Sequence, residues 1–181
     1  KVGLKKAKSV FFENVQNAQV MIDDKTITKE QAVVMNGAGV NLERFSFSPM
    51  PKDDITKFLF VGRVMEEKGV NELFDAIKKI KSEKIKTEFG FLGWFEEDYS
   101  QIIKDLEAKD YIKYYGYQKD VVKYMREAHC IVLPSYHEGM ANVLLEGASI
   151  GRALIASDIH GCKESIINGV SGFTCRVKNS D

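Results

Sequence analysis

The chain has 181 residues, of which 44% are hydrophobic and 29% are charged, as is ordinary for a soluble globular protein. This length predicts one well-packed domain rather than two. Lysine plus arginine equals aspartate plus glutamate at 26 each. The balance gives no reason to expect a nucleic-acid partner or a strongly basic membrane patch.

The longest apolar runs, such as residues 58–61, are far shorter than the roughly 20 residues that span a bilayer. The first residues contain no signal-peptide core. Cys130, Cys162 and Cys175 form no Cys-x-x-Cys pair, which favours reduced, structural thiols. We therefore expect a soluble, cytosolic chain.

Short apolar runs alternate with longer amphipathic segments, a pattern typical of an α/β protein with a parallel sheet. Apolar residues at helical spacing predict helices over residues 70–82, 99–108 and 121–128, and another helix begins at Asn142. We expect the sheet to be Rossmann-like, with helices on both faces. The predicted strands are residues 9–13, 32–35, 58–61, 88–92, 112–115, 130–133 and 153–156.

Three motifs follow predicted strands directly. Gly62 and Arg63 follow strand 58–61, Glu138 follows strand 130–133, and residues 157–158 follow strand 153–156. Ligands of open parallel sheets bind at the carboxyl ends of the strands. The three motifs are therefore expected to meet in one cleft.

The segment from Glu138 to Glu146 carries the most specific signal. Glu138 lies in the predicted strand-to-helix turn, and Glu146 follows it about two helical turns later. Backbone amides at the start of a helix have no acceptor within it and attract anions. The amides expected to point outward here, where a diphosphate could bind, are those of Gly139, Met140, Ala141 and Asn142. Two carboxylates on either side of such amides suit a ligand that carries phosphates between two groups rich in hydroxyls. A nucleotide sugar is such a ligand.

Residues 62–69, 138–147 and 151–158 resemble family 4 of the retaining glycosyltransferases, in that family's order and spacing. Residues 39–45 are similar to its Gly-Val-Asp-x-x-x-Phe turn, so the likeness runs from about residue 10 to the end. The resemblance implies a GT-B architecture of two Rossmann-like domains. Residues 1–181 match its C-terminal donor-binding domain, and the N-terminal acceptor domain is absent.

The resemblance also assigns roles to residues. Arg63 and Lys68 would neutralise the leaving nucleoside diphosphate, and Glu138 would face the transferred sugar; these are the candidate catalytic residues. Glu146 would hold the ribose hydroxyls. Met140 and Ala141 depart from the family's usual residues, which affects pocket shape more than charge. The complete donor-binding set is Gly62, Gly139, Met140, Ala141, Asn142, Val143 and Glu146.

The implied reaction moves a hexosyl unit from UDP or GDP to an acceptor hydroxyl with retention, in surface or capsular polysaccharide synthesis. No cofactor and no metal are expected, since the nucleotide sugar is a substrate and the chain has no Asp-x-Asp. The acceptor, a sugar or a lipid-linked sugar, would bind through the missing domain, so this fragment alone is expected to be inactive. The full-length protein would be cytoplasmic, with peripheral association at the inner face of the plasma membrane.

Other interpretations remain open. Glu66 and Glu67 could pair with the cations of a solvated loop, and Glu138 or Asn142 could cap the following helix. Trp94 could stack on a base or sugar, or simply pack.

The same fold could also bind a nucleotide sugar without catalysis. A dehydrogenase is disfavoured because no Gly-x-Gly-x-x-Gly follows a predicted strand. A zinc site at His137 lacks a second histidine, because position 141 is Ala141. A glycosidase is disfavoured because the two acids of the turn would not flank one bond.

Overall fold

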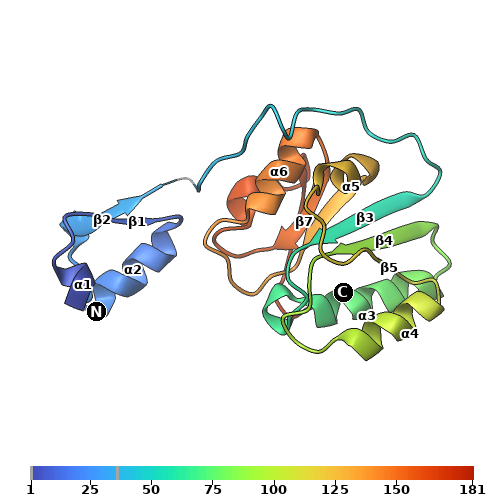
Figure 1. Ribbon diagram of the computed structural model, residues 1–181, viewed down its shortest axis with the longest axis horizontal. Helices are drawn as coiled ribbons and strands as arrows, with labels where there is room; N and C mark the ends of the chain where they lie inside the picture. Colours follow the sequence, from blue (N-terminus) through green and yellow to red (C-terminus); the bar gives the residue numbers. More distant parts are fainter. Residues whose placement is uncertain (1, 36) are drawn as a thin grey trace.

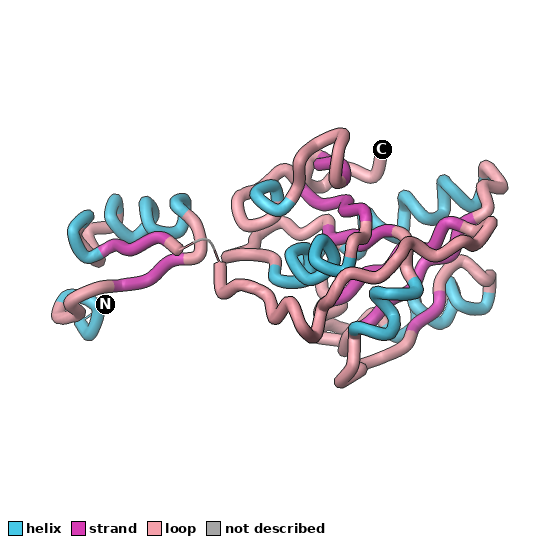
Figure 2. The backbone as a smooth tube through the Cα atoms, turned by 90° about the horizontal axis from the view of Figure 1, so that it is seen from above, coloured by secondary structure: helices cyan, strands magenta, loops and turns pink. Residues whose placement is uncertain are grey.

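The computed structural model describes residues 2–35 and 37–181, which form a small N-terminal α/β unit and a larger one (Figure 1). In the small unit, β1 (Val10–Phe12) and β2 (Ala32–Val34) pair in parallel. Helices α1 (Val2–Lys5) and α2 (Val15–Asp23) and the 3-10 turn Lys29–Gln31 complete it. Seen from above, this unit lies beyond one end of the larger unit (Figure 2).

The larger unit is built on a six-stranded parallel sheet with the strand order β5-β4-β3-β6-β7-β8. Its strands are β3 (Thr56–Val61), β4 (Thr87–Leu92), β5 (Lys113–Tyr114), β6 (Cys130–Leu133), β7 (Ala153–Ser157) and β8 (Gly172–Cys175). The order reverses between β3 and β6: the chain leaves β3 toward β4 and leaves β6 toward β7. This is the topological switch point, where ligands of such sheets bind.

Helices cover both faces of the large sheet (Figure 1). Helices α3 (Val70–Ser82) and α4 (Ser100–Ala108) lie on one face, and α5 (Val122–Glu127) and α6 (Asn142–Ile150) lie on the other. The 3-10 turns Glu66–Lys68 and Lys163–Ser165 sit in loops that follow β3 and β7. The prediction of a Rossmann-like sheet with helices on both faces is confirmed.

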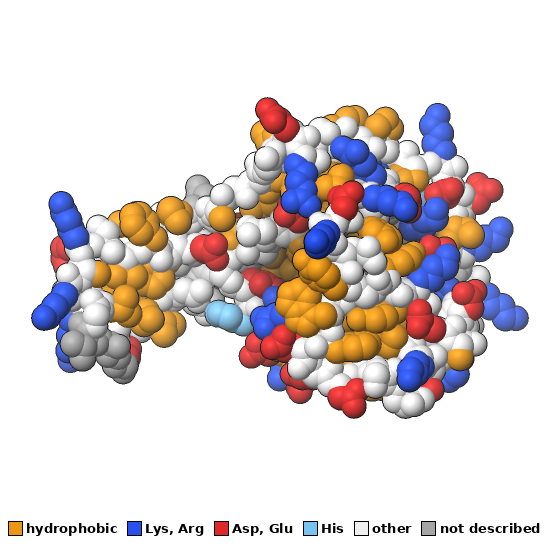
Figure 3. Space-filling view, viewed as in Figure 1, with side chains coloured by type: hydrophobic (Ala, Val, Ile, Leu, Met, Phe, Trp, Pro, Cys, Tyr) orange, Lys and Arg blue, Asp and Glu red, His pale blue; other side chains and the backbone are white. Residues whose placement is uncertain are grey.

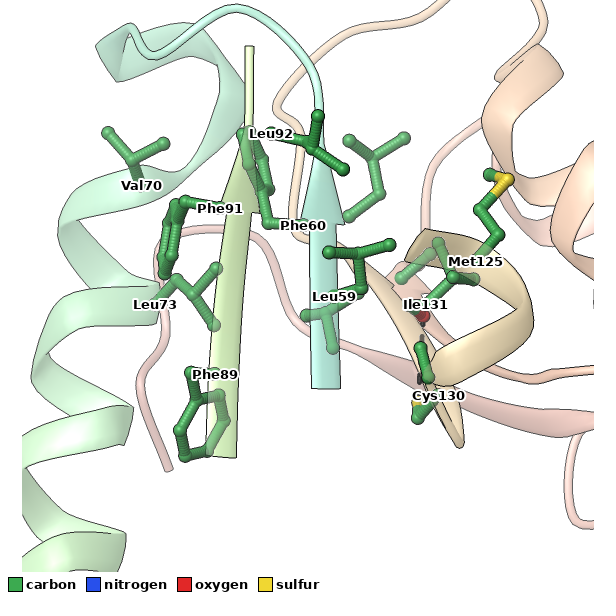
Figure 4. Close-up of a cluster of buried hydrophobic side chains, with 14 of the residues drawn as sticks. Leu59, Phe60, Val70, Leu73, Phe89, Phe91, Leu92, Met125, Cys130 and Ile131 are labelled. Carbon is green, nitrogen blue, oxygen red and sulfur yellow. Dashed lines mark hydrogen bonds between the residues drawn. The ribbon is translucent and has the colours of Figure 1, made fainter. Parts of the chain in front are cut away.

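The core lies between the sheet and these helices. Apolar residues recur every three or four positions along α3, so one face of this helix is buried. Figure 4 shows Val70 and Leu73 of α3 beside Phe91 and Phe89 of β4. On the opposite face, Leu59, Met125 and Ile131 gather, because successive strand residues point to opposite sides.

The predicted strands and helices are all present, with small shifts at their ends. Among the described α-helices and strands, α1, α2 and β8 were not predicted. The predicted strands 9–13 and 32–35 do form, but they pair with each other in the small unit and do not extend the large sheet. Among the described residues, no helix is both long and apolar enough to cross a bilayer.

Candidate functional site

The loops that follow β3 and β6 meet at the switch point. The amide of Tyr136 donates a hydrogen bond to the carbonyl oxygen of Glu67, at 2.8 Å. Gly69 has a left-handed φ of 69°, and its Cα lies so close to the carbonyl of Pro134 that any Cβ would overlap that oxygen. The two loops are therefore in backbone contact, although about 70 residues separate them in the sequence.

This contact brings two candidate catalytic side chains together. The Lys68 ammonium lies 2.6 Å from Oε1 of Glu138, and the two side chains are only 17% and 13% exposed. The hydroxyl of Ser135 donates to the same carboxylate oxygen at 2.7 Å. Glu138 is thus a partly buried carboxylate held by a cation and a hydroxyl.

A cavity of about 560 Å³ opens beside this pair. Its wall carries Arg63 and Lys68, so two cations face one space. Trp94 and Tyr117 meet edge to face at 5.6 Å between ring centroids and supply an exposed aromatic surface. The lining residues are Val61, Gly62, Arg63, Lys68, Leu92, Gly93, Trp94, Glu96, Tyr117, Gln118 and Val121.

The structure separates the two aromatic residues of the loop after β4. Trp94 faces the cavity and is 48% exposed. Phe95 instead stacks on Tyr114 at 4.9 Å, with ring planes 16° apart. Trp94 is therefore available for stacking, whereas Phe95 packs against the protein.

The cations do not pair with Glu66 and Glu67 as the solvated-loop interpretation required. Lys68 binds Glu138, and Arg63 lies 3.6 Å from Glu96 on the next loop. That interpretation is wrong in this detail, because the short 3-10 turn directs Lys68 toward the β6 loop. The Arg63–Glu96 pair is more than 40% exposed, and such pairs contribute little to stability. Arg63 thus remains available to an anion.

Two of the four amides expected to point outward are already used. The amide of Ala141 donates to the carbonyl of Gly161 at 2.7 Å, and that of Asn142 donates to the carbonyl of Met140 at 3.0 Å. The expectation is wrong for Ala141 because the backbone at Gly161 packs directly against the turn, and it is wrong for Asn142 because its amide bonds within the turn itself. Within the described chain, the amides of Gly139 and Met140 donate no hydrogen bond.

Neither proposed side-chain cap of α6 forms. Ala141 is the N-cap residue, and no side chain caps the helix. Asn142 is the first helical residue and is exposed. The cap interpretations of Glu138 and Asn142 are therefore wrong, because neither side chain caps α6.

Glu146 lies half-buried on α6, and Val143 is half-buried one turn earlier. Burial raises the pKa of the Glu146 carboxyl, and the positive charge of Arg44 opposes this rise. A partly buried carboxylate is poorly solvated when ionised. This is typical of a site where the carboxylate accepts hydrogen bonds from a ligand. Of the predicted site residues, however, only Gly62, Arg63 and Lys68 line the cavity itself.

Sequence reasoning missed two contributors, Ser135 and Glu96. Ser135 has no exposed surface, and its hydroxyl is directed at Glu138. A serine three residues before the acid could have been suspected from its position alone. Glu96 could not, because only the pairing of β3 with β4 brings its loop beside Arg63.

An open parallel sheet with cations, a held carboxylate and an aromatic-walled cavity at its switch point defines a doubly wound α/β ligand-binding domain. The particular family follows from comparison with known proteins. Residues 43–181 match the family described as glycosyl transferases group 1, and the chain belongs to this family.

The chain is 27% identical to the N,N'-diacetylbacillosaminyl-diphospho-undecaprenol alpha-1,3-N-acetylgalactosaminyltransferase of Campylobacter jejuni. The match covers 99% of the chain and 50% of that protein. It is 25% identical to the capsular polysaccharide biosynthesis glycosyltransferase CapM of Staphylococcus aureus, over 63% of the chain and 31% of that protein. The fold matches HepE of Anabaena in complex with UDP-glucose, with a TM-score of 0.81 at 18% identity over 99% of the chain and 52% of HepE. The chain thus spans about half the length of the first of these relatives.

Proposed function

We propose that this chain is the donor-binding half of a retaining family 4 glycosyltransferase, which uses a UDP- or GDP-sugar as donor and no metal. The observation that carries the proposal is the double position of Lys68. Lys68 lines the cavity, and its ammonium holds the Glu138 carboxylate. Lys68 therefore connects a cavity large enough for a nucleotide with the Glu138 carboxylate, which is suited to accept hydrogen bonds from the sugar.

The same geometry suggests how transfer would proceed. As the bond between sugar and diphosphate breaks, negative charge grows on the leaving nucleoside diphosphate. Arg63 and Lys68 would offset that charge from the cavity wall. A diphosphate beside Lys68 would also compete with Glu138 for the ammonium, which would free the carboxylate to accept hydrogen bonds from the sugar hydroxyls.

Glu146 would accept hydrogen bonds from the ribose hydroxyls, since one carboxylate can serve two vicinal donors. Gly139 and Met140 would offer their free amides to the diphosphate. Trp94 and Tyr117 would provide the apolar surface for the base. The remaining donor-binding residues, Gly62, Ala141, Asn142 and Val143, would shape the backbone around the ligand.

The relatives' names support a role in the synthesis of surface or capsular polysaccharide. CapM is named for capsule synthesis, and the Campylobacter jejuni enzyme is named for an undecaprenol-linked acceptor. We propose a similar acceptor here, either a sugar or a lipid-linked sugar, bound by a preceding N-terminal domain. A lipid-linked acceptor would place the full-length protein in the cytoplasm, in peripheral contact with the inner face of the plasma membrane.

Calorimetric titration of the chain with UDP, GDP and ADP tests the donor site. We expect selective binding of UDP or GDP, and Arg63→Ala should weaken it by about 1.5 to 3 kcal/mol because a charge-assisted hydrogen bond is lost. Glu146→Ala should weaken it as well. Arg126→Ala is the matched control, since Arg126 is exposed and binds Ser46 away from the cavity. Equal affinity of Arg63→Ala and the wild-type chain would remove Arg63 from the site.

Transfer by this chain alone should be negligible, because the acceptor would bind the other domain. Incubation with UDP-glucose and a panel of sugar acceptors, followed by measurement of released UDP, checks this. Sustained acceptor-dependent release would show that the catalytic groups assigned here are wrongly placed.

A further inference from the structure

Asn14 connects the small N-terminal unit to the turn that carries Glu138. It lies between β1 and α2, and it is only 5% exposed. Its side-chain Nδ2 donates to the carbonyl of Glu138 at 3.1 Å and to the carbonyl of Gly139 at 2.7 Å. A buried amide from one unit thus holds two consecutive carbonyls of the other.

The other end of the same amide has a separate task. Oδ1 of Asn14 accepts from the backbone amide of Asn17 at 2.8 Å, which makes Asn14 the N-cap of α2. Capping needs only this oxygen, and aspartate caps helices as well as asparagine does. The Nδ2 group contributes nothing to α2, so its two hydrogen bonds require another explanation.

Other contacts show that the small unit is closely seated on this turn. The Glu13 carboxylate occupies the space into which a Cβ on Gly139 would project. The side chain of Met140 lies against Gly37, where an added Cβ would come within 2.6 Å of its Cγ. The carbonyl of Gly161 in turn accepts a hydrogen bond from the amide of Ala141. The turn is therefore held between two segments.

We propose that Asn14 is a positioning residue for the donor site. By fixing the carbonyls of Glu138 and Gly139, it orients the two peptide groups that also carry the amides of Gly139 and Met140, so that these amides stay free for a diphosphate. This inference rests on the proposed function. It also makes nucleotide affinity depend on how the N-terminal unit sits against the turn.

Asn14→Asp separates the two tasks of this side chain. Aspartate keeps the oxygen that caps α2, removes the donor, and places a carboxylate against two carbonyl oxygens. Loss of two hydrogen bonds should speed hydrogen exchange by about tenfold to thirtyfold at the amide of Ala141, which donates to the carbonyl of Gly161 from the same turn. The Kd for UDP should rise by about threefold to tenfold, while exchange within α2 and the melting temperature of the large unit stay as in the wild-type chain. Asn14→Ser, which also keeps an acceptor oxygen, provides a second variant if aspartate prevents folding.

Gln19→Gly is the matched control. Gln19 is exposed in the middle of α2, and glycine there loosens the helix without touching the turn. Unchanged exchange at the Ala141 amide of Asn14→Asp would overturn the proposal. So would equal acceleration in Gln19→Gly, because the turn would then respond to any loosening of the small unit. Hydrogen exchange needs no nucleotide, so if the wild-type chain binds no UDP, the donor assignment fails while the exchange comparison still decides the role of Asn14.

Discussion

At the scale of single residues, the ion pair of Lys68 and Glu138 should contribute both to folding stability and to the candidate donor site. Each side chain is largely shielded from water, so neither would find full solvation if its partner were removed. Ser135 supplies one further hydrogen bond to the carboxylate but no charge. The pair therefore holds the two loops together and keeps both charged groups beside the cavity.

Lys68→Met should lower the free energy of unfolding by about 1 to 3 kcal/mol, because it leaves a partly buried carboxylate without its cation. Glu138→Gln should cost less than this, since glutamine still accepts from Ser135. A double-mutant cycle measured by urea denaturation should give a coupling of about 0.5 to 3 kcal/mol between the two sites. Lys78→Met is the control: Lys78 pairs with Asp75 on the exposed face of α3, where pairs contribute about 1 kcal/mol or less. A coupling near zero would show that the contact has no energetic role.

Glu146 should make stability depend on pH. Burial raises the pKa of its carboxyl above the ordinary value for glutamate, so the folded chain binds this proton more tightly than the unfolded chain does. Its contribution to stability is therefore fully present below the unfolded pKa and is lost as the pH rises through the folded pKa. At neutral pH the ionised group is a net cost.

Glu146→Gln should accordingly become more stable than the wild-type chain as the pH rises from acid to neutral. The variant should also lose nucleotide affinity. Urea denaturation at pH 4 and pH 7.5 measures the gain, and Glu43→Gln on an exposed loop gives the background effect of the same replacement. A difference in unfolding free energy that stays constant across this range would contradict the assignment of the burial cost to Glu146.

At the scale of elements, Gly69 determines how the β3 loop enters α3. It ends the 3-10 turn that carries Lys68 and begins the helix, with a left-handed φ of 69°. The carbonyl of Pro134 fills the space beside its Cα. Only glycine accommodates both the conformation and the contact.

Gly69→Ala should therefore cost about 3 kcal/mol or more, since left-handed strain of about 1 to 2 kcal/mol is added to a backbone collision. Gly39→Ala isolates the strain alone, because Gly39 has a similar φ of 79° and open space around it. Thermal unfolding of the two variants measures the difference. Equal costs would mean that the β6 loop moves aside easily.

The sequence predicted best those elements in which the spacing of apolar residues is regular enough to show where the helix or strand lies. Helix α3 begins and ends where its apolar spacing does, because four of its apolar residues pack into one core. Helix α2 was missed since Ala18 is its only buried residue among those described, so its pattern is weak. Strand β8 was missed because it is a four-residue edge strand whose Phe173 is 62% exposed.

At the scale of the whole molecule, the sequence predicted that the candidate site residues lie at strand ends, but it did not predict the contacts between them and the rest of the chain. The positions of Gly62, Arg63, Lys68 and Glu138 follow from strand ends, which local patterns reveal. The partners of these residues come from other loops: Glu96 from the β4 loop and Asn14 from the other unit. Such pairings depend on sheet order and on the seating of the two units, which no local pattern encodes.

The two units should also differ in stability. The small unit has a sheet of two three-residue strands, and parallel strands are normally buried on both faces. Here Phe11 is 61% exposed and Val33 is 36% exposed, and hydrophobic side chains gather over this unit (Figure 3). Two-stranded sheets are marginal by themselves, whereas the six-stranded sheet encloses a continuous apolar core.

Native-state hydrogen exchange should consequently report two opening free energies. We expect amides of β1 and β2 to exchange at least about a hundredfold faster than those of β3, β4 and β6, because the small unit can open while the large unit stays folded. Low concentrations of urea should accelerate exchange in the large sheet steeply and in the small unit only weakly, since local opening exposes less surface. Equal protection and equal urea dependence in both sheets would show instead that the contacts of Asn14, Glu13 and Met140 merge the two units into one cooperative structure.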